Sequence, residues 1–325
     1  MKIALIGTGV YGTAIAMALN KKNKNITMWT ESEERYSKYI KDGNVIKDVI
    51  PGMEIPKNIK LTISYEKAVK DADIVFITST AAFVGSICKN INPYITKKTV
   101  VCIASKGIEN TSCAFLSDIA YDNLKTKHIA IISGPSFAID MASNNPVGLS
   151  LASHSRKATK LIKEALENDT LKLRPTSDLI GVQICGSVKN IIAVAAGMLD
   201  GIDMSCLKGA LMSRGTYEIA KLTQAMGGKV MTAYGLSHLG DFEATLFSPY
   251  SHNRMWGEQF VKGETFGKSA EGVGNIKGIL YLAKKHNISM PITEALYNII
   301  FEHKELKSEF EKLFLRSIKN EFEEL

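Results

Sequence analysis

The chain has 325 residues, 45% hydrophobic and 22% charged, a composition typical of a globular protein with a full core. No stretch reaches the ~18 uninterrupted apolar residues of a membrane-spanning helix. The first apolar run, residues 3–6, is too short for a signal peptide, so none is expected. The net charge is +7, but no Lys/Arg block is interleaved with aromatic residues, so nucleic acid is not an expected partner.

The cysteines also narrow the class of protein. There are five of them, an odd number, and none form a CxxC pair. We therefore expect no disulfide framework and no metal site, and a reducing cytoplasm as the compartment. Small anionic molecules remain suitable partners, because they benefit from a modest positive surplus.

The N-terminal half alternates short, β-branched apolar runs with amphipathic stretches, which predicts βαβ units and a parallel sheet. The expected strands are residues 2–6, 25–29, 73–79, 99–104, 128–133 and 147–152, with a further strand around Leu61. The expected crossover helices are residues 11–20, 66–70, 83–91 and 111–121.

After about Asp178 strand-like runs stop and helical periodicity takes over. The expected helices are residues 180–199, 208–226, 270–286, 293–302 and 305–325. The prediction is an α/β domain with a parallel sheet at residues 1–182, followed by an all-helical domain at residues 183–325.

A glycine-rich turn follows the first strand and opens the first helix. Its sequence, GTGVYG at residues 7–12, fits the GxGxxG pattern in the strand–turn–helix context that the pattern requires. Gly7 permits the tight turn, Gly9 admits a pyrophosphate close to the backbone, and Gly12 lets the helix pack on the sheet. The N-terminal domain is therefore predicted to be Rossmann-like and to bind a dinucleotide.

Glu31 comes at the end of the second strand, about twenty residues past the last glycine. A carboxylate there accepts from the 2′-hydroxyl of the ribose and repels a 2′-phosphate. No arginine stands nearby until Arg35. The sequence thus favours NAD, with NADP as the alternative.

Two lysines occupy unusual places. Lys106 directly follows the strand at residues 99–104, at the sheet edge where open α/β folds bind ligands. Lys189 lies in the middle of a helix among small neighbours such as Gly186 and Ala193, which predicts an enclosed amine with a lowered pKa.

Motifs along nearly the whole chain resemble those of bacterial NAD(P)-dependent glycerol-3-phosphate dehydrogenases, with a 6-phosphogluconate dehydrogenase-like C-terminal domain. The matching segments are residues 7–12, 105–109, 133–138, 186–190, 210–215, 240–241, 251–254, 271–272 and 290–294. The resemblance implies an enzyme that interconverts glycerol 3-phosphate and dihydroxyacetone phosphate, supplies glycerol 3-phosphate for phospholipid synthesis, and forms a homodimer.

The resemblance also implies residue roles. Lys189 is the expected proton acceptor in oxidation and donor in reduction, Lys106 contacts the substrate near the nicotinamide, and Asp241 holds substrate and orients Lys189. The other residues implied at the substrate are Gly134, Ser136, Ser251, His252, Asn253 and Arg254. The residues implied at the cofactor are Gly7, Gly9, Val10, Tyr11, Gly12, Glu31, Lys106, Ala138, His252, Ser269 and Glu271.

The chain departs from the family pattern at the phosphate end. The family usually has arginine before Asn253, where this chain has His252, and imidazole is only partly charged at neutral pH. Arg254 is the candidate to replace that arginine, and Cys206 stands where asparagine is common. These departures leave open a related dehydrogenase for another small hydroxy or keto acid, and a non-catalytic NAD-binding sensor is the third reading.

Overall fold

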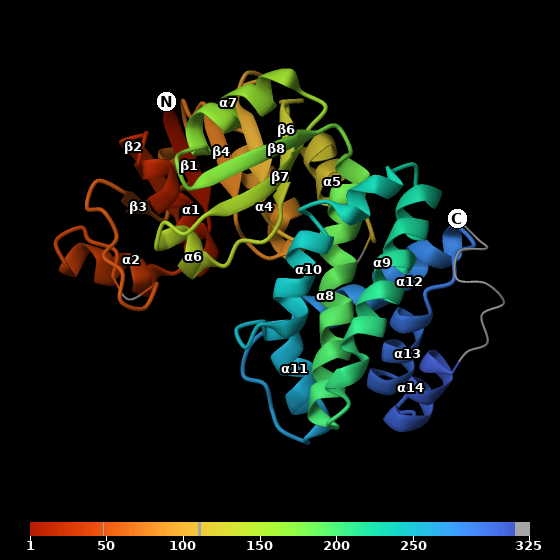
Figure 1. Cartoon of the computed structure of the whole chain (residues 1–325). Helices are drawn as coiled ribbons and strands as arrows, with labels where there is room; N and C mark the ends of the chain where they lie inside the picture. Colours follow the sequence, from red (N-terminus) through yellow and green to blue (C-terminus); the bar gives the residue numbers. More distant parts are fainter. Residues whose placement is uncertain (48, 110–111, 316–325) are drawn as a thin grey trace.

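The computed structural model describes residues 1–47, 49–109 and 112–315, which form a sheet-containing region followed by a helical one (Figure 1). The strands are β1 (Lys2–Ile6), β2 (Asn25–Trp29), β3 (Lys60–Thr62), β4 (Ile74–Ile77), β5 (Val100–Ile103), β6 (Ile129–Ser133), β7 (Val147–Ala152) and β8 (Leu171–Thr176). The helices among them are α1 (Val10–Asn20), α2 (Glu33–Lys41), α3 (Tyr65–Val69), α4 (Val84–Ile91), α5 (Leu116–Asn123), α6 (Ala138–Ala142) and α7 (Arg156–Leu166).

The eight strands form one sheet in the order β3-β2-β1-β4-β5-β6-β7-β8. The pairs from β3 to β6 are parallel, as predicted. The prediction is wrong for the far edge, because β7 runs antiparallel to β6, and β8, which was not predicted, runs parallel to β7. The six parallel strands share one carboxyl edge, and the strand order reverses there beside β1, where such folds bind ligands.

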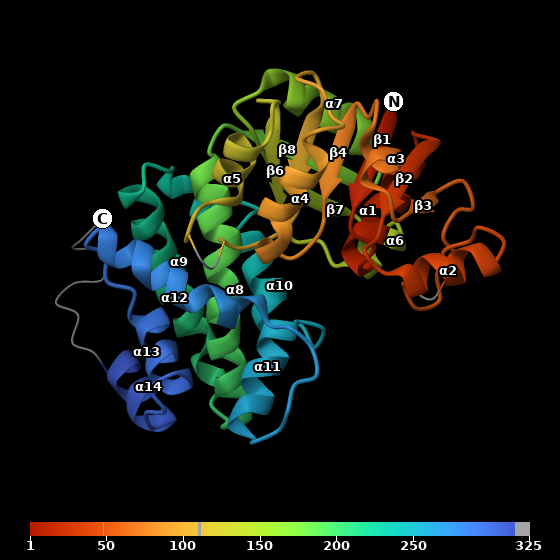
Figure 2. The same cartoon turned by 180° about the vertical axis from the view of Figure 1, so that it is seen from behind.

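Helices cover both faces of the sheet, which explains why its strands are apolar on both sides. Helices α1 and α7 pack on one face (Figure 1), and α3, α4 and α5 pack on the other (Figure 2). The predicted helix at residues 111–121 begins later, at Leu116, and residues 110–111 lie outside the described part.

The C-terminal region is helical, as predicted, and is built around one long helix. Its α-helices are α8 (Leu179–Gly201), α9 (Lys208–Ala225), α10 (Leu239–Phe247), α11 (His252–Val261), α12 (Glu271–Lys285), α13 (Pro291–Ile300) and α14 (Leu306–Phe314). Helix α8 contacts α9 through α13. The last predicted helix, residues 305–325, is present as α14, and residues 316–325 lie outside the described part.

The start of α8 is held by an aspartate. Asp178 is its N-cap, and its Oδ1 accepts from the Gly181 backbone N–H at 2.9 Å. The other oxygen accepts from the Lys229 backbone N–H at 2.9 Å and from the Thr232 hydroxyl. One carboxylate therefore begins the helix and anchors the following loop to it.

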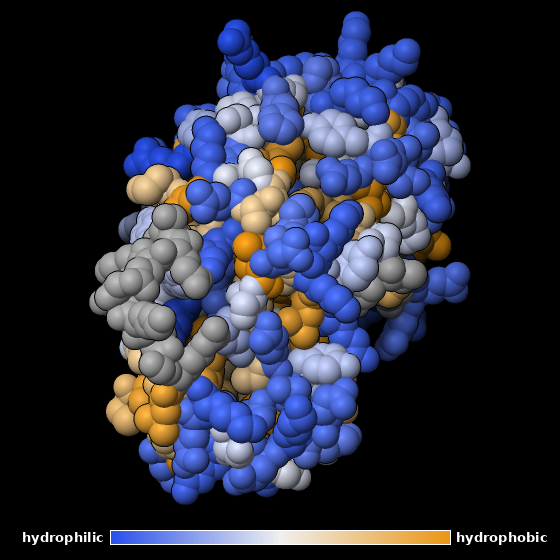
Figure 3. All heavy atoms as spheres, turned by 90° about the vertical axis from the view of Figure 1, so that its right-hand side faces the viewer, coloured by the Kyte–Doolittle hydropathy of each residue, from blue (hydrophilic) through white to orange (hydrophobic). Residues whose placement is uncertain are grey.

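Among the described helices, α8 is the one that is long and apolar enough to cross a membrane by length and composition. However, 94% of the apolar 18-residue stretch of this helix is buried inside the fold, as in a core helix. On the face shown in Figure 3, hydrophilic side chains dominate and hydrophobic ones appear in separate patches.

Candidate active site

Three charged side chains from distant segments meet where the helical region faces the carboxyl edge of the sheet. Lys106 follows β5, Lys189 projects from the middle of α8, and Asp241 lies in the first turn of α10. Oδ2 of Asp241 lies 2.9 Å from Nζ of Lys106 and 2.6 Å from Nζ of Lys189. The structure therefore brings together all three residues that we expected to be catalytic.

The enclosure expected for Lys189 is confirmed, because the residue is 1% exposed. Burial lowers the pKa of Lys189 to about 8, with Asp241 opposing the fall and Lys106 adding to it. For Lys106, burial also lowers the pKa, but Asp241, Tyr11 and Glu271 together outweigh it and the net pKa is raised. For Asp241, burial raises the pKa, but the two ammonium groups outweigh it and the net pKa is lowered. At neutral pH, Asp241 is therefore a carboxylate and Lys106 an ammonium, while Lys189 is poised to exchange a proton.

Thr245 also contacts the Lys189 amine, and no sequence pattern predicted this contact. Nζ of Lys189 donates to Oγ1 of Thr245 at 3.0 Å, and that hydroxyl donates to the backbone carbonyl of Asp241. Thr245 lies one helical turn after Asp241 on α10, so the two side chains share a face. Together they fix the direction in which the amine points.

Tyr11 and Ser136 connect this cluster to the glycine-rich turn. The Tyr11 hydroxyl lies 3.0 Å from Oγ of Ser136, which donates to the Gly134 carbonyl at 3.3 Å. Burial raises the pKa of Tyr11, and the charge of Lys106 acts in the opposite direction. Tyr11, Gly134 and Ser136 thus lie at the same edge as Lys106. Gly134 has φ +150°, which favours glycine at this sharp turn after β6.

The shape of the glycine-rich turn fits a bound dinucleotide. A Cβ on Gly12 would overlap Oγ1 of Thr78 and lie 2.8 Å from the Gly7 carbonyl, so packing alone demands this glycine. A Cβ on Gly9 would meet nothing within 4 Å. Gly9 is also the N-cap of α1 and supplies no side-chain hydrogen bond to its first turn. Open space before an uncapped helix N-terminus suits a pyrophosphate.

Several other residues expected at the cofactor border the same edge. Val10 is 48% exposed at the start of α1, and Ala138 begins the short helix α6. Glu31 is exposed just after β2, while Ser269 is exposed just before α12. Val10, Glu31 and Ser269 are exposed and therefore accessible to a bound molecule.

Glu271 and Asn253 lie where α12 and α11 meet α8. Oε2 of Glu271 lies 3.4 Å from Nδ2 of Asn190, the residue after Lys189. Burial raises the pKa of Glu271, and the charges of Lys106 and Lys189 oppose the rise. The side chain of Asn253 accepts from the Gly272 backbone N–H at 2.9 Å, so it joins the two helix starts.

The neighbouring residues that were expected to bind the phosphate have different surroundings in the structure. Ser251 caps α11 by accepting from the Arg254 backbone N–H at 3.4 Å. His252 is exposed and meets the Phe266 ring edge-on, with 5.8 Å between centroids. Burial lowers the pKa of His252, and the charge of Lys268 lowers it further. The imidazole is therefore mostly neutral at pH 7 and does not supply the charge of the family's arginine.

The expectation that Arg254 replaces that arginine is not met. Its guanidinium lies 2.6 Å from Oδ2 of Asp200 and 2.9 Å from Oε2 of Glu258. Asp200 is eleven residues after Lys189 on α8, roughly 16 Å along the axis at ~1.5 Å per residue. Arg254 joins helices at the far end of the bundle because two carboxylates there compensate its burial.

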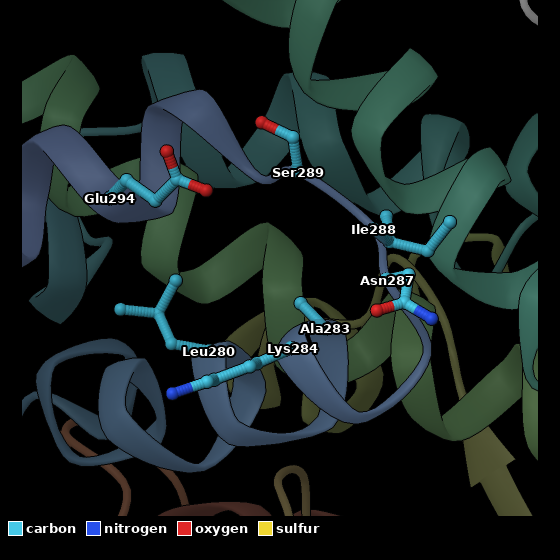
Figure 4. A pocket seen from close by; sticks show the side chains of 7 residues that line it. All are labelled: Leu280, Ala283, Lys284, Asn287, Ile288, Ser289 and Glu294. Carbon is cyan, nitrogen blue, oxygen red and sulfur yellow. The ribbon is translucent and has the colours of Figure 1, made fainter.

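A hollow lies away from the Asp241 cluster, between α12 and the start of α13 (Figure 4). It is open, has a volume of about 540 Å³ and is lined by Leu280, Ala283, Lys284, Asn287, Ile288, Ser289 and Glu294. None of these residues was expected at the active site.

Comparison with known proteins agrees with this geometry. Residues 2–159 match the family model for the NAD-dependent glycerol-3-phosphate dehydrogenase N-terminus, and residues 178–311 match the model for its C-terminus. The curated glycerol-3-phosphate dehydrogenase [NAD(P)+] of Wigglesworthia glossinidia brevipalpis is 35% identical over 322 residues, covering 96% of this chain and 98% of that protein. The Bacillus subtilis protein of the same name is 33% identical, covering 100% and 97%.

The solved structures agree as well. The crystal structure of glycerol-3-phosphate dehydrogenase from Coxiella burnetii superposes with a TM-score of 0.90 at 29% identity, covering 97% of this chain and 99% of that one. Both regions of the fold are thus matched over their full extent. The chain belongs to the NAD-dependent glycerol-3-phosphate dehydrogenase family.

Proposed function

We propose that this protein interconverts glycerol 3-phosphate and dihydroxyacetone phosphate, using NAD or NADP. The observation that carries the proposal is the pair of lysines held on one oxygen of Asp241 beside a glycine-rich turn open to a dinucleotide. The curated relatives named above share this activity in their names and align over their full length.

The glycine-rich turn at residues 7–12 would hold the dinucleotide, whose nicotinamide would supply or accept the hydride at C2 of the substrate. Lys189 moves the proton: its ammonium donates to the carbonyl oxygen in the reduction, and its neutral amine accepts from the hydroxyl in the oxidation. Asp241 and Thr245 aim that amine. Lys106 remains charged and polarises the same oxygen.

The surroundings suit an anionic substrate. Two lysines face one carboxylate, so the cluster is positive when Lys189 is protonated. We expect Gly134, Ser136 and Asn253 to offer backbone, hydroxyl or amide groups to the substrate. The cation that the family's arginine would add is absent at His252, so we expect the lysines to provide most of the attraction for the phosphate.

The wider setting is part of the same proposal. We expect residues 1–182 to hold the cofactor and residues 183–325 to carry the proton-transfer machinery, in a homodimer located in the cytoplasm. The product would supply glycerol 3-phosphate for phospholipid synthesis. Light scattering coupled to size-exclusion chromatography measures the assembly directly.

The decisive assay follows NADH oxidation with dihydroxyacetone phosphate in the wild type and in Lys189→Met. Because the substitution removes the proton donor while keeping the chain length, we expect kcat to fall by about 10²–10⁴-fold. Lys160→Met, at an exposed position on α7, is the control and should retain wild-type turnover.

Two results would refute the assignment: an inactive wild type, or full activity in Lys189→Met. A substrate panel separates the alternatives. Preference for a non-phosphorylated hydroxy or keto acid would indicate the related dehydrogenase, and cofactor binding without turnover on any substrate would indicate the sensor.

A further inference from the structure

Three connecting segments meet at the amino edge of the sheet, whereas Lys106 follows the opposite, carboxyl end of β5. Residues 92–99 lead into β5 and residues 122–128 lead into β6, so both lie where these parallel strands begin. Residues 153–157 follow β7, whose antiparallel run brings its end back toward the start of β6. Together these twenty residues form what we call the basic edge. In Figure 1 the N-terminus, where β1 begins, marks the same edge, and the helical region lies toward the other one.

Hydrogen bonds join the three segments of the basic edge. Nζ of Lys157 donates to the Lys98 backbone carbonyl at 2.5 Å, which links the third segment to the first. Nζ of Lys125 donates to the Pro93 backbone carbonyl at 3.3 Å, which links the second segment to the first. The segments therefore form one continuous surface. Because both amines bind neutral oxygens, their positive charges remain uncompensated.

The basic edge carries most of the net charge of the chain. It holds six Lys/Arg and one Asp, whereas the other 305 residues hold 34 Lys/Arg and 32 Asp/Glu. An even spread of the net charge of +7 would leave twenty residues close to neutral. Five of the six cations are exposed and Lys157 is half-buried. The six are Lys97, Lys98, Lys125, Lys127, Arg156 and Lys157.

The surroundings of these cations do not neutralise them. Within the part of the chain that the structure describes, none of the six forms an ion pair with a carboxylate. The next lysine on α7 differs, because Nζ of Lys160 lies 3.8 Å from Oε1 of Glu164. The positive potential also acts on His128, whose pKa is lowered by burial and further by the charge of Lys157. The basic edge is therefore a patch of unpaired positive charge.

The composition of this patch suits a diffuse anionic surface better than a nucleic acid. Five of its cations are lysines, which act as point charges and need no fixed geometry, whereas arginine forks read phosphates and bases. A single-stranded nucleic acid site stacks successive bases on several aromatic rings, but the basic edge contains one Tyr and no Phe or Trp. That residue, Tyr94, is 39% exposed, and amphipathic rings of this kind lie at the headgroup level of membranes.

We propose that the basic edge binds the surface of an anionic phospholipid membrane, so that the opposite edge of the sheet, with the Asp241 cluster, faces away from the lipid. Lysines near a negatively charged leaflet add their separate attractions, and these decay within a Debye length of ~10 Å at 0.1 M salt. The attachment is therefore electrostatic and reversible. This inference goes beyond the proposed reaction and does not rest on it.

The test is cosedimentation with vesicles of phosphatidylglycerol and phosphatidylcholine in equal parts. We expect the protein to bind these vesicles at low salt, to leave them at about 0.5 M NaCl, and not to bind vesicles of phosphatidylcholine alone. Lys97→Gln/Lys98→Gln should weaken binding about 25-fold, because each lysine near such a surface contributes a factor of about five. Lys284→Gln/Lys285→Gln, which removes a like pair of exposed lysines from the end of α12, is the matched control and should bind as the wild type does.

Three results would overturn the proposal: no binding of the wild type to the anionic vesicles, undiminished binding of Lys97→Gln/Lys98→Gln, or an equal loss in both double variants. Tighter binding to oligothymidylate than to the vesicles would also contradict it and would assign the patch to nucleic acid. The substitution at Lys98 keeps the backbone carbonyl that Lys157 binds, so the fold should be retained, and thermal unfolding checks this. No measurement here needs turnover, so failure of the proposed reaction would not be mistaken for failure of this inference.

Discussion

Lys106 and Lys189 bind the same oxygen of Asp241, yet their pKa values move in opposite directions. The side chain of Lys106 keeps 22% exposure, whereas that of Lys189 keeps 2%. A less hydrated ammonium is harder to maintain, and the charge of Lys106 repels that of Lys189, so the net pKa falls at Lys189 and rises at Lys106. In the proposed mechanism this difference divides the roles: Lys106 remains a cation, and Lys189 exchanges a proton.

The pKa of about 8 for Lys189 predicts opposite pH profiles for the two directions of the reaction. Reduction needs the ammonium, so its kcat/KM should fall as the pH rises through about 8. Oxidation needs the neutral amine, so its kcat/KM should rise through the same region. Initial rates from pH 6 to 10 in both directions check this, and profiles that move in the same direction would contradict the assignment of Lys189.

Asp241→Asn should change the position of that profile as well as its height. The carboxylate opposes the lowering of the Lys189 pKa, so its removal should move the midpoint to lower pH. We expect kcat to fall by about 10²-fold, because the amine also loses its alignment. Asp200→Asn, at a carboxylate bound to Lys208 and Arg254, is the matched control and should leave the midpoint in place.

The candidate site was partly predictable residue by residue. Lys106 and Lys189 stood out because their local sequence is unusual for lysine. Thr245 had no such signal, because a threonine in a helix is ordinary until a buried amine lies beside it. The expectation for Arg254 followed its place in the chain, but the carboxylates of Asp200 and Glu258 bind it elsewhere.

At the scale of the elements, two glycines of the glycine-rich turn have different surroundings: a side chain has no room at Gly12 but has open space at Gly9. Gly12→Ala should destabilise the fold by about 1–3 kcal/mol, because its Cβ has no room beside Thr78 and Gly7. Gly9→Ala should leave the free energy of unfolding within about 1 kcal/mol, since its Cβ meets nothing, but should weaken NADH binding. Urea unfolding and a fluorescence titration measure the two effects, and normal NADH affinity in Gly9→Ala would remove Gly9 from the cofactor site.

Two elements that the sequence did not predict, β8 and α2, have weak local patterns. Strand β8 alternates buried and exposed residues and contains Pro175, as an edge strand does, so it lacks the continuous apolar run of the inner strands. Helix α2 buries Tyr39 alone, so it has little apolar periodicity to detect. The strands β1, β2, β4, β5, β6 and β7 were recognised because each is an apolar run set by its own residues.

On the scale of the whole molecule, α8 is the axis on which the site is assembled. Helices α11 and α12 approach it closely because the contact points are glycines: a Cβ on Gly257 would overlap the Val194 carbonyl, and one on Gly272 would overlap the Asn190 carbonyl. Since Gly272 follows Glu271 and Asn190 follows Lys189, the packing also sets the active-site spacing.

Gly257→Ala should therefore destabilise the protein by at least about 1–3 kcal/mol, as overpacking does. Gly209→Ala is its control in α9, where a Cβ would meet nothing within 4 Å and should be neutral or slightly stabilising. Thermal unfolding of the two variants measures the difference. Equal melting temperatures would show that α11 can move away from α8 at no cost.

Local patterns in this chain were sufficient to predict a glycine-rich turn between a strand and a helix, the parallel part of the sheet, a helical second half and the two lysines that meet at Asp241. Each of these depends on residues close together in the sequence, whose spacing sets a turn, a strand or a helix. The meeting of Lys106 with Asp241, 135 residues apart, and of Arg35 with Thr8 depends on how finished elements pack. No local pattern encodes that packing, and it is the packing that gives Lys189 its lowered pKa and holds Arg35 against Thr8.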